Sequence, residues 1–192
     1  MAVTNGYCTL AELRARLGAI TGKTDQDSVM EDTIEAASRS IDKYTGRKFY
    51  AASGTYYYTP SHFDLLFVNN DIVSIGTLST DEDGDRTYET TWSATDYDLL
   101  PFNESVKTMI EVTPQGLYNF PLDRKSVKIE GTFGIDGAPH DIREACLLLS
   151  ARYFKRKDTP FGIAGVTELG VTQMLQQDTD IQALLNPWRR VI

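Results

Sequence analysis

The chain has 192 residues, a formal net charge of −8 and a pI near 4.8. Its 41% hydrophobic content is ordinary for a protein that buries a core, and its length suits one domain or a domain with an insert. The acidic balance argues against a protein that grips nucleic acid, because phosphate binding needs a basic face. It does not exclude a protein that lets DNA pass without gripping it.

The sequence predicts neither a membrane span nor export. No apolar run reaches eighteen residues, and the N-terminus lacks the basic and apolar regions of a secretory signal. Cys8 and Cys146 are the only cysteines. We expect Cys146 to be a free buried thiol, with a Cys8–Cys146 disulfide as the minor alternative. The missing secretory signal and the expected free thiol both favour a reducing compartment.

Two helices are predicted in the first fifty residues. In the first, Thr9 and Glu12 form a capping box. The second has a possible capping box at Ser28 and Glu31 and ends at Gly46, a good C-cap. Apolar residues of the second helix recur every three or four positions and give one continuous stripe: Met30, Ile34, Ala37, Ile41 and Tyr44.

Residues 52–135 form a predicted β insert. Strand-like runs occupy residues 55–59, 65–68, 72–78, 87–92, 97–99, 109–112 and 127–133. Residues 81–85 form an acidic turn signal, so the runs on either side are expected to make a β-hairpin. Ten acidic residues and one basic residue lie between positions 61 and 104. We expect Asp96 and Asp98 to lie on the solvated face of a strand.

The clearest helix spans residues 138–157. Pro139 suits its first turn, where the missing N–H costs nothing, and basic residues cluster near its C-terminal end. Its apolar stripe is wide, which predicts burial on more than one side. The members of this stripe are Ile142, Cys146, Leu149 and Tyr153, with Leu147, Leu148 and Phe154 beside them.

The C-terminal region is predicted to be a loop or extended segment, then a short helix near residues 179–185, then an apolar and basic end. The last residues are Trp188, Arg189, Arg190, Val191 and Ile192. Such an end either docks on its own body or inserts into a partner. The predicted class is therefore α+β. Residues 1–51 and 136–160 form a small helical bundle, residues 52–135 form an antiparallel β insert between the second and third helices, and residues 161–192 form a C-terminal arm.

No catalytic or cofactor motif is present. His62 and His140 lie in no zinc pattern, and the sequence contains neither a phosphate-binding loop nor a nucleophile elbow. A dense carboxylate cluster does occur, but its spacing is not that of an EF-hand loop, so we interpret it as a solvated hairpin tip. The cluster consists of Asp81, Glu82, Asp83 and Asp85. A metal-dependent nuclease at this cluster is a minor alternative; we predict no catalytic residue, metal or cofactor.

Three segments together resemble the head–tail connector proteins of tailed bacteriophages, also called adaptor or head-completion proteins. They read Y-C-T-L-A-E-L at residues 7–13, I-E-A-A-S-R-S-I-D-K-Y-T-G-R at residues 34–47, and D-I-R-E-A-C-L-L-L at residues 141–149, with R-Y-F-K-R at residues 152–156. The resemblance covers residues 7–50 and 138–160. It is weaker in the insert, which is much shorter in small family members.

The resemblance implies a non-enzymatic virion protein at the head–tail interface, assembled in the host bacterial cytoplasm. It implies a homo-oligomeric ring, usually of twelve copies, beneath the portal. Such a ring extends the DNA channel without binding DNA specifically and offers a platform to the next tail component, a terminator, stopper or nozzle protein.

The resemblance also assigns roles to residues. In related adaptors the C-terminal segment grips the portal, a role that would fall here to Trp188, Arg189, Arg190, Val191 and Ile192. Independently of the resemblance, the wide apolar stripes of the helices predict core or subunit contacts at Ile34, Ile41, Tyr44, Ile142, Leu149 and Tyr153. The role of the insert stays open between neighbouring subunits, a tail protein and a fibre. The alternative reading is a receptor- or carbohydrate-binding β module of a virion, based on Tyr56, Tyr57 and Tyr58.

Overall fold

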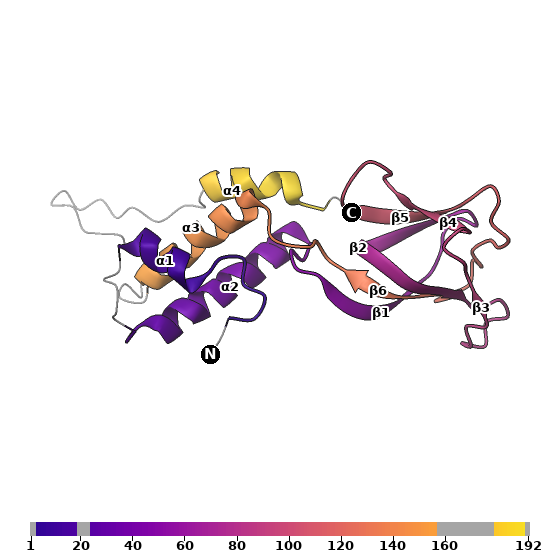
Figure 1. The fold of residues 1–192 in the computed structure, drawn as a ribbon, viewed down its shortest axis with the longest axis horizontal. Helices are drawn as coiled ribbons and strands as arrows, with labels where there is room; N and C mark the ends of the chain where they lie inside the picture. The colour runs from indigo at the N-terminus through magenta and orange to yellow at the C-terminus, as the bar shows by residue number, and fades with distance from the viewer. Residues whose placement is uncertain (1–2, 19–23, 157–178, 191–192) are drawn as a thin grey trace. The chain divides into compact units, whose positions relative to one another are not determined.

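The structure is a computed structural model that describes residues 3–18, 24–156 and 179–190 (Figure 1). The helices are α1 (Leu10–Leu17), α2 (Asp27–Thr45), α3 (His140–Arg156), α4 (Thr179–Leu185) and the 3-10 turn η1 (Asn186–Trp188). The strands are β1 (Ala52–Tyr58), β2 (Leu65–Thr80), β3 (Thr90–Thr91), β4 (Tyr97–Leu100), β5 (Lys107–Val112) and β6 (Val127–Phe133). The predicted α+β class is confirmed.

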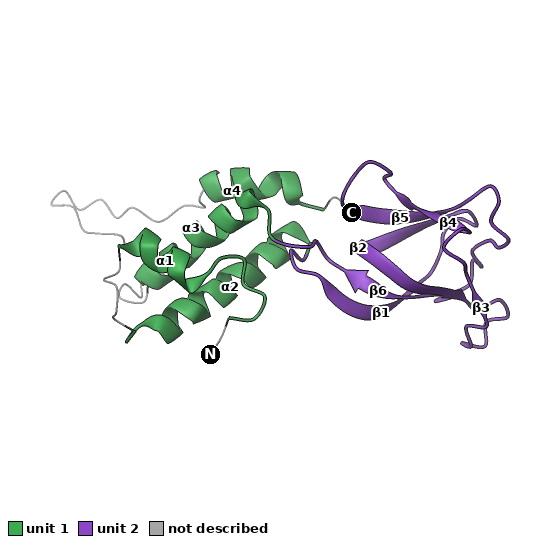
Figure 2. Ribbon diagram, in the orientation of Figure 1, with its two compact units in different colours: residues 1–47, 138–192 green, residues 48–137 purple. Residues whose placement is uncertain are grey.

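The chain forms two compact units (Figure 2). Unit 1 consists of residues 1–47 and 138–192 and carries the helices, whereas unit 2 consists of residues 48–137 and carries the strands. The loop or extended segment predicted after α3 lies within residues 157–178, outside the described residues.

Unit 1 is a helical bundle. Helices α2 and α3 pack along each other, α1 packs on both, and α4 packs on α3 and α2. Burial of each large apolar side chain stabilises the bundle by about 1.5–3 kcal/mol. The buried apolar residues of these helices are Leu13, Met30, Ile34, Ala37, Ile41, Ile142, Ala145, Cys146, Ile181 and Leu185.

The ends of the first two helices test the predicted caps. The backbone N–H of Thr9 donates to Glu12 Oε2 (2.8 Å) and the N–H of Glu12 donates to Thr9 Oγ1 (3.2 Å), so this capping box is confirmed. The box predicted at Ser28 and Glu31 is wrong, because α2 begins at Asp27 and Ser28 already lies in its first turn. Gly46 ends α2 in the left-handed conformation, as expected of a C-cap.

The apolar stripes of the long helices are buried unevenly. The first four members of the α2 stripe are buried, but Tyr44 is 37% exposed, because it lies in the last turn and its hydroxyl reaches outward to Asn186. In α3, Ile142 and Cys146 are buried, whereas the run Leu147, Leu148 and Leu149 is only half-buried. Successive helical residues point about 100° apart, so three consecutive leucines cannot all face one core.

Unit 2 is built on an antiparallel sheet with strand order β1-β6-β2-β5-β4, and β3 pairs with β2. Strand β2 lies in the middle of the sheet and pairs with a different neighbour along each half of its length. Its beginning pairs with β5, with Leu66 opposite Ile110, and its end pairs with β6, with Leu78 opposite Ile129. The prediction of two separate strands at residues 65–68 and 72–78 is therefore wrong; register shifts within one strand interrupt its alternation.

The buried side chains of unit 2 form one hydrophobic core. Strand β6 alternates as predicted: Val127, Ile129 and Phe133 are buried in it. Gly131 continues the same face, and a Cβ there would lie 2.3 Å from the carbonyl oxygen of Ser74, so only glycine permits this approach of β2 and β6. The remaining buried members of the core are Tyr58, Leu66, Val68, Ile72, Leu78, Trp92, Ile110 and Phe120.

The hairpin predicted across residues 81–85 is confirmed, since β3 pairs with β2 in antiparallel register, although β3 is limited to two residues. Asp98 is exposed as predicted, but Asp96 is buried. Its carboxylate accepts a hydrogen bond from the N–H of Ser93 (2.8 Å), so it closes the turn before β4 instead of facing solvent.

Candidate functional site at the C-terminal end of helix α2

The end of the described chain lies against the last turn of α2. The backbone N–H of Arg190 donates to the carbonyl oxygen of Thr45 (2.8 Å), and Arg47 Nε donates to the carbonyl oxygen of Trp188 (3.0 Å). The last carbonyls of a helix have no partner within the helix. Gly46 turns the chain away there, and the C-terminal segment satisfies one of these carbonyls instead. We call residues 186–190 the C-terminal clamp.

Side chains add to this contact. The hydroxyl of Tyr44 donates to Asn186 Oδ1 (2.7 Å), and the guanidinium of Arg189 lies over the Tyr44 ring, 6.0 Å from its centroid. Cations near the C-terminal end of a helix are stabilised by its dipole, and Arg47, Arg189 and Arg190 all lie there. Arg189 is exposed, while Trp188 and Arg190 are half-buried. The clamp thus presents cationic and aromatic surface next to a helix end.

An apolar pocket lies beside the clamp, between α2, α3 and α4. Its volume is about 260 Å³. Its lining is mainly aliphatic and aromatic, with Arg152 as its one cationic member. The lining residues are Ser40, Ile41, Tyr44, Leu149, Arg152, Ile181, Gln182 and Leu185.

The predicted site residues fall into three groups. Ile34, Ile41 and Ile142 are fully buried in the bundle. Tyr44 and Leu149 line the pocket, and Tyr153 is half-buried with its hydroxyl 3.3 Å from Ser40 Oγ. Among the C-terminal residues, Trp188, Arg189 and Arg190 belong to the clamp, whereas Val191 and Ile192 lie outside the described residues.

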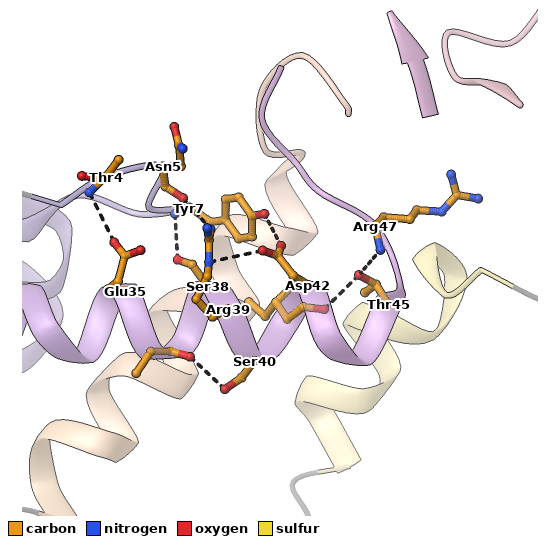
Figure 3. A network of polar contacts seen from close by, with 12 residues as sticks. Thr4, Asn5, Tyr7, Glu35, Ser38, Arg39, Ser40, Asp42, Thr45 and Arg47 are labelled. Carbon is orange, nitrogen blue, oxygen red and sulfur yellow. Dashed lines mark hydrogen bonds and ion pairs between the residues drawn. The ribbon is translucent and has the colours of Figure 1, made fainter. Parts of the chain in front are cut away.

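Sequence reasoning missed how the N-terminal segment is held. Residues 3–8, which we call the N-terminal strap, run along α2 (Figure 3). The N–H of Thr4 donates to Glu35 (3.3 Å), and the N–H of Tyr7 donates to Ser38 Oγ (3.1 Å). The Tyr7 hydroxyl donates to the carboxylate of Asp42. A segment of six residues is too short to give a periodic signal, so only its partners on α2 reveal how it is held.

The acidic turn of unit 2 is solvated as predicted at Glu82, Asp83 and Asp85, which are exposed, but Asp81 is an exception. The carboxylate of Asp81 is buried and accepts hydrogen bonds from the N–H groups of Gly84 (2.7 Å) and Arg86 (2.9 Å). Burial raises the pKa of Asp81, but these backbone hydrogen bonds outweigh it, so the pKa lies below its usual value. Carboxylate oxygens of Asp81, Asp83 and Asp85 lie within 4.8 Å of one another. The geometry is that of a side chain that closes its own turn.

Charge is divided unequally between the units. Unit 1 contains 13 acidic and 13 basic residues, so it is neutral overall. Unit 2 contains 14 acidic and 6 basic residues and carries the whole net charge of −8. Within residues 3–18, 24–156 and 179–190, no helix combines the length and the apolar character that crossing a membrane requires.

Comparison with known proteins links this architecture to virion necks. No protein-family model and no curated protein matches the sequence. A chain from the neck of an empty gene transfer agent (GTA) particle, computed with C6 symmetry, is similar with a TM-score of 0.64 at 22% identity, covering 100% of this chain and 94% of that chain. The chain has the fold of a GTA neck protein.

Two further structures agree. A chain from the neck of the native GTA particle, computed with C12 symmetry, has a TM-score of 0.61 at 20% identity, and the match covers 93% of that chain. A chain from the virion of the native GTA particle has a TM-score of 0.62 at 20% identity, and the match covers 94% of that chain. The predicted resemblance to head–tail connectors is thus confirmed at the level of the fold. All three matches span this entire chain, so unit 2 is part of the shared fold, although the sequence resemblance is carried by the helices.

Proposed function

We propose that the chain is a head–tail connector: a structural, non-enzymatic subunit in the neck of a phage-like virion. The observation that carries this proposal is the full-length fold shared with the GTA neck chains, over both the helical and the β unit. The absence of catalytic motifs from the sequence is consistent with a purely structural role.

The connector acts as a ring of identical subunits, with twelve copies as the proposed number. The neck structures with C6 and C12 symmetry support a cyclic assembly. In a ring, one face of a subunit meets a different face of its neighbour. The half-buried leucines of α3 and the apolar pocket beside the clamp are candidate surfaces for that contact, because isolated subunits rarely leave such area uncovered.

The C-terminal clamp is the proposed contact with the portal. Aromatic and arginine side chains dominate the binding energy of protein interfaces, and the clamp offers Trp188, Arg189 and Arg190 on an ordered support. Residues 191–192 extend the same segment and add two apolar side chains. Of the two predicted alternatives, docking on its own body describes residues 186–190, and a segment preorganised on α2 loses less entropy on binding a partner.

The acidic unit 2 suits a protein around a DNA channel. Fixed negative charge repels phosphate and lets DNA slide without sticking. With the portal on one side, the ring extends the channel and provides the platform for the next tail component. The protein would therefore reside at the head–tail interface of the virion and assemble in the host cytoplasm.

The proposal is tested by mixing the purified protein with the portal ring from the same genome and measuring molar mass by light scattering after gel filtration. We expect a co-eluting complex with about one copy per portal subunit, as a symmetric ring contact requires. If the unaltered protein never co-elutes with the portal, the connector role is refuted.

The clamp is tested in the same assay with the double variant Trp188→Ala and Arg189→Glu. The matched control is Arg124→Glu, which makes the same charge change at an exposed arginine of unit 2. We expect the double variant to lose portal binding while the control keeps it. Retained binding by a folded double variant would overturn the clamp assignment without affecting the connector role.

The carbohydrate-binding alternative loses support in the structure. Tyr58 is buried in the core and the Tyr56 ring packs edge-on against Phe133, with centroids 4.7 Å apart. Of the three predicted tyrosines, Tyr57 alone is strongly exposed, with Tyr88 beside it at 5.6 Å.

A further inference from the structure

Two reduced cysteines meet in the interior of unit 1. The sulfur atoms of Cys8 and Cys146 are 3.3 Å apart, although 138 positions separate the residues in the sequence. Both are buried; Cys8 ends the N-terminal strap, and Cys146 lies in the middle of α3. A disulfide has a sulfur–sulfur distance of about 2.05 Å, so bond formation requires a movement of roughly 1.2 Å.

Both residues flanking Cys8 are anchored, which holds its sulfur at this position. Tyr7 before it is bound to α2 through Ser38, and Thr9 after it is the N-cap of α1. Ser150 Oγ lies 4.0 Å from the Cys8 sulfur and 3.8 Å from the Cys146 sulfur. Ser38 Oγ also lies 3.5 Å from the Cys146 sulfur, so the pair has two neighbouring hydroxyls and an anchored backbone on both sides of Cys8.

The surroundings also favour reaction at Cys146. The hydrogen bond shared with Cys8 lowers the pKa of Cys146, with smaller contributions from the hydroxyls of Ser38 and Ser150. The pKa of Cys8 is raised by the same hydrogen bond and by burial. A thiolate is the reactive form of cysteine, so Cys146 is the nucleophile and Cys8 the resolving thiol.

We propose that Cys8 and Cys146 are an oxidative modification site, at which a peroxide forms a disulfide that locks the N-terminal strap onto α3. The inference does not rest on the connector role. In the first step the Cys146 thiolate attacks one oxygen of the peroxide, the O–O bond breaks, and the other oxygen leaves as hydroxide, which takes up the thiol proton as water.

In the second step the Cys8 sulfur attacks the sulfur of the Cys146 sulfenic acid. The S–S bond forms, the S–O bond breaks, and the oxygen leaves as water with the Cys8 proton. Each sulfur has lost one electron and hydrogen peroxide has gained two, giving two molecules of water in total. The new bond covalently joins a segment before α1 to α3, so the strap can no longer leave the bundle without reduction.

The test exposes the purified full-length protein to hydrogen peroxide under native conditions and measures its intact mass and its peptides without reduction. We expect a mass loss of two hydrogens, a linked peptide containing Cys8 and Cys146, and full reversal by dithiothreitol. Closing so long a loop should raise Tm by roughly 5–15 °C. A gain of one or more oxygen atoms in place of the linked peptide, or no reaction of either thiol, would overturn the proposal.

Two further measurements distinguish a Cys8–Cys146 disulfide that holds the N-terminal strap from incidental oxidation of either thiol. In Cys8→Ser, peroxide should add oxygen to Cys146 instead of forming a cross-link, because the resolving thiol is gone. In the unaltered protein, hydrogen exchange at the N–H groups of residues 4–8 should slow on oxidation and recover on reduction. A disulfide that forms while exchange in the strap stays unchanged would refute the locking of the strap.

Discussion

Trp92 and Thr80 offer a sharp test of how unit 2 is held together. The indole N–H of Trp92 donates to Thr80 Oγ1 (3.0 Å) inside the core, and the ring stacks on Phe120 with centroids 4.7 Å apart. Trp92 is 5% exposed and Thr80 is fully buried, so water cannot replace this hydrogen bond. The substitution Thr80→Val keeps the shape of the side chain and removes the acceptor.

The expected cost follows from this geometry. A buried donor left without a partner costs about 1–3 kcal/mol. Thr80 also donates to Glu82 Oε1 (3.0 Å), a partly exposed bond whose loss adds roughly 0.5–1 kcal/mol. The added methyl group offsets about 0.8 kcal/mol through its burial. We therefore expect Thr80→Val to lower the free energy of unfolding by about 1–3 kcal/mol.

Urea unfolding followed by circular dichroism measures this change in a double-mutant cycle with Trp92→Phe. Because the chain has two tryptophans, Trp92 in unit 2 and Trp188 in unit 1, fluorescence in a Trp188→Phe background shows which unit unfolds. With Phe at position 92 there is no indole N–H left without a partner, so Thr80→Val should cost about 1–3 kcal/mol less than with Trp. Equal costs in both backgrounds would show that the hydrogen bond contributes nothing.

Three other predictions concern both units. Ile41→Asp places an unpaired charge at a fully buried position of α2 and should destabilise unit 1 by several kcal/mol, whereas Val29→Asp on the exposed face of the same helix should change the urea midpoint little. Gly46→Ala should cost about 1 kcal/mol in the same assay, because the residue has a φ of +69° and a Cβ there would meet Arg190 only at an ordinary 3.6 Å. Folding lowers the pKa of Asp81, so this carboxylate adds to the stability of unit 2 above its usual pKa of 3.8 and ceases to do so as the pH falls through its pKa in the folded protein. The variant Asp81→Asn should therefore lose less stability than the unaltered protein between pH 5 and pH 2. A pH profile of stability identical to that of the unaltered protein would contradict this.

The periodic parts of the chain could be predicted from the sequence because their signals are local. Four residues of the α2 stripe are buried, the capping box at Thr9 and Glu12 is present, and β6 alternates as expected. Each signal depends on a repeat of about 3.6 or 2 residues, or on a cap that contacts its own helix. The predictions failed where a bulge shifted the alternation, as in β2, or where a buried carboxylate closes its own turn through backbone N–H groups, as with Asp81 and Asp96.

The candidate site was only partly visible for a related reason. The aromatic and basic C-terminus indicated a contact surface, but its composition suits docking on its own body and insertion into a partner equally. The partners that decide between them, Thr45, Arg47 and Tyr44, lie more than 140 positions away from the segment they hold. No periodicity links residues at such separations.

By itself, the sequence determined the helices and most strands, the acidic balance, and the likeness to connector proteins carried by residues 7–50 and 138–160. The tertiary structure alone decided that the C-terminal clamp caps α2, that the strap lies along the same helix, and that Cys8 meets Cys146. The physical reason is that local propensity and amphipathic pattern act between near neighbours, whereas hydrogen bonds and thiol contacts between distant segments exist only once the core has brought them together.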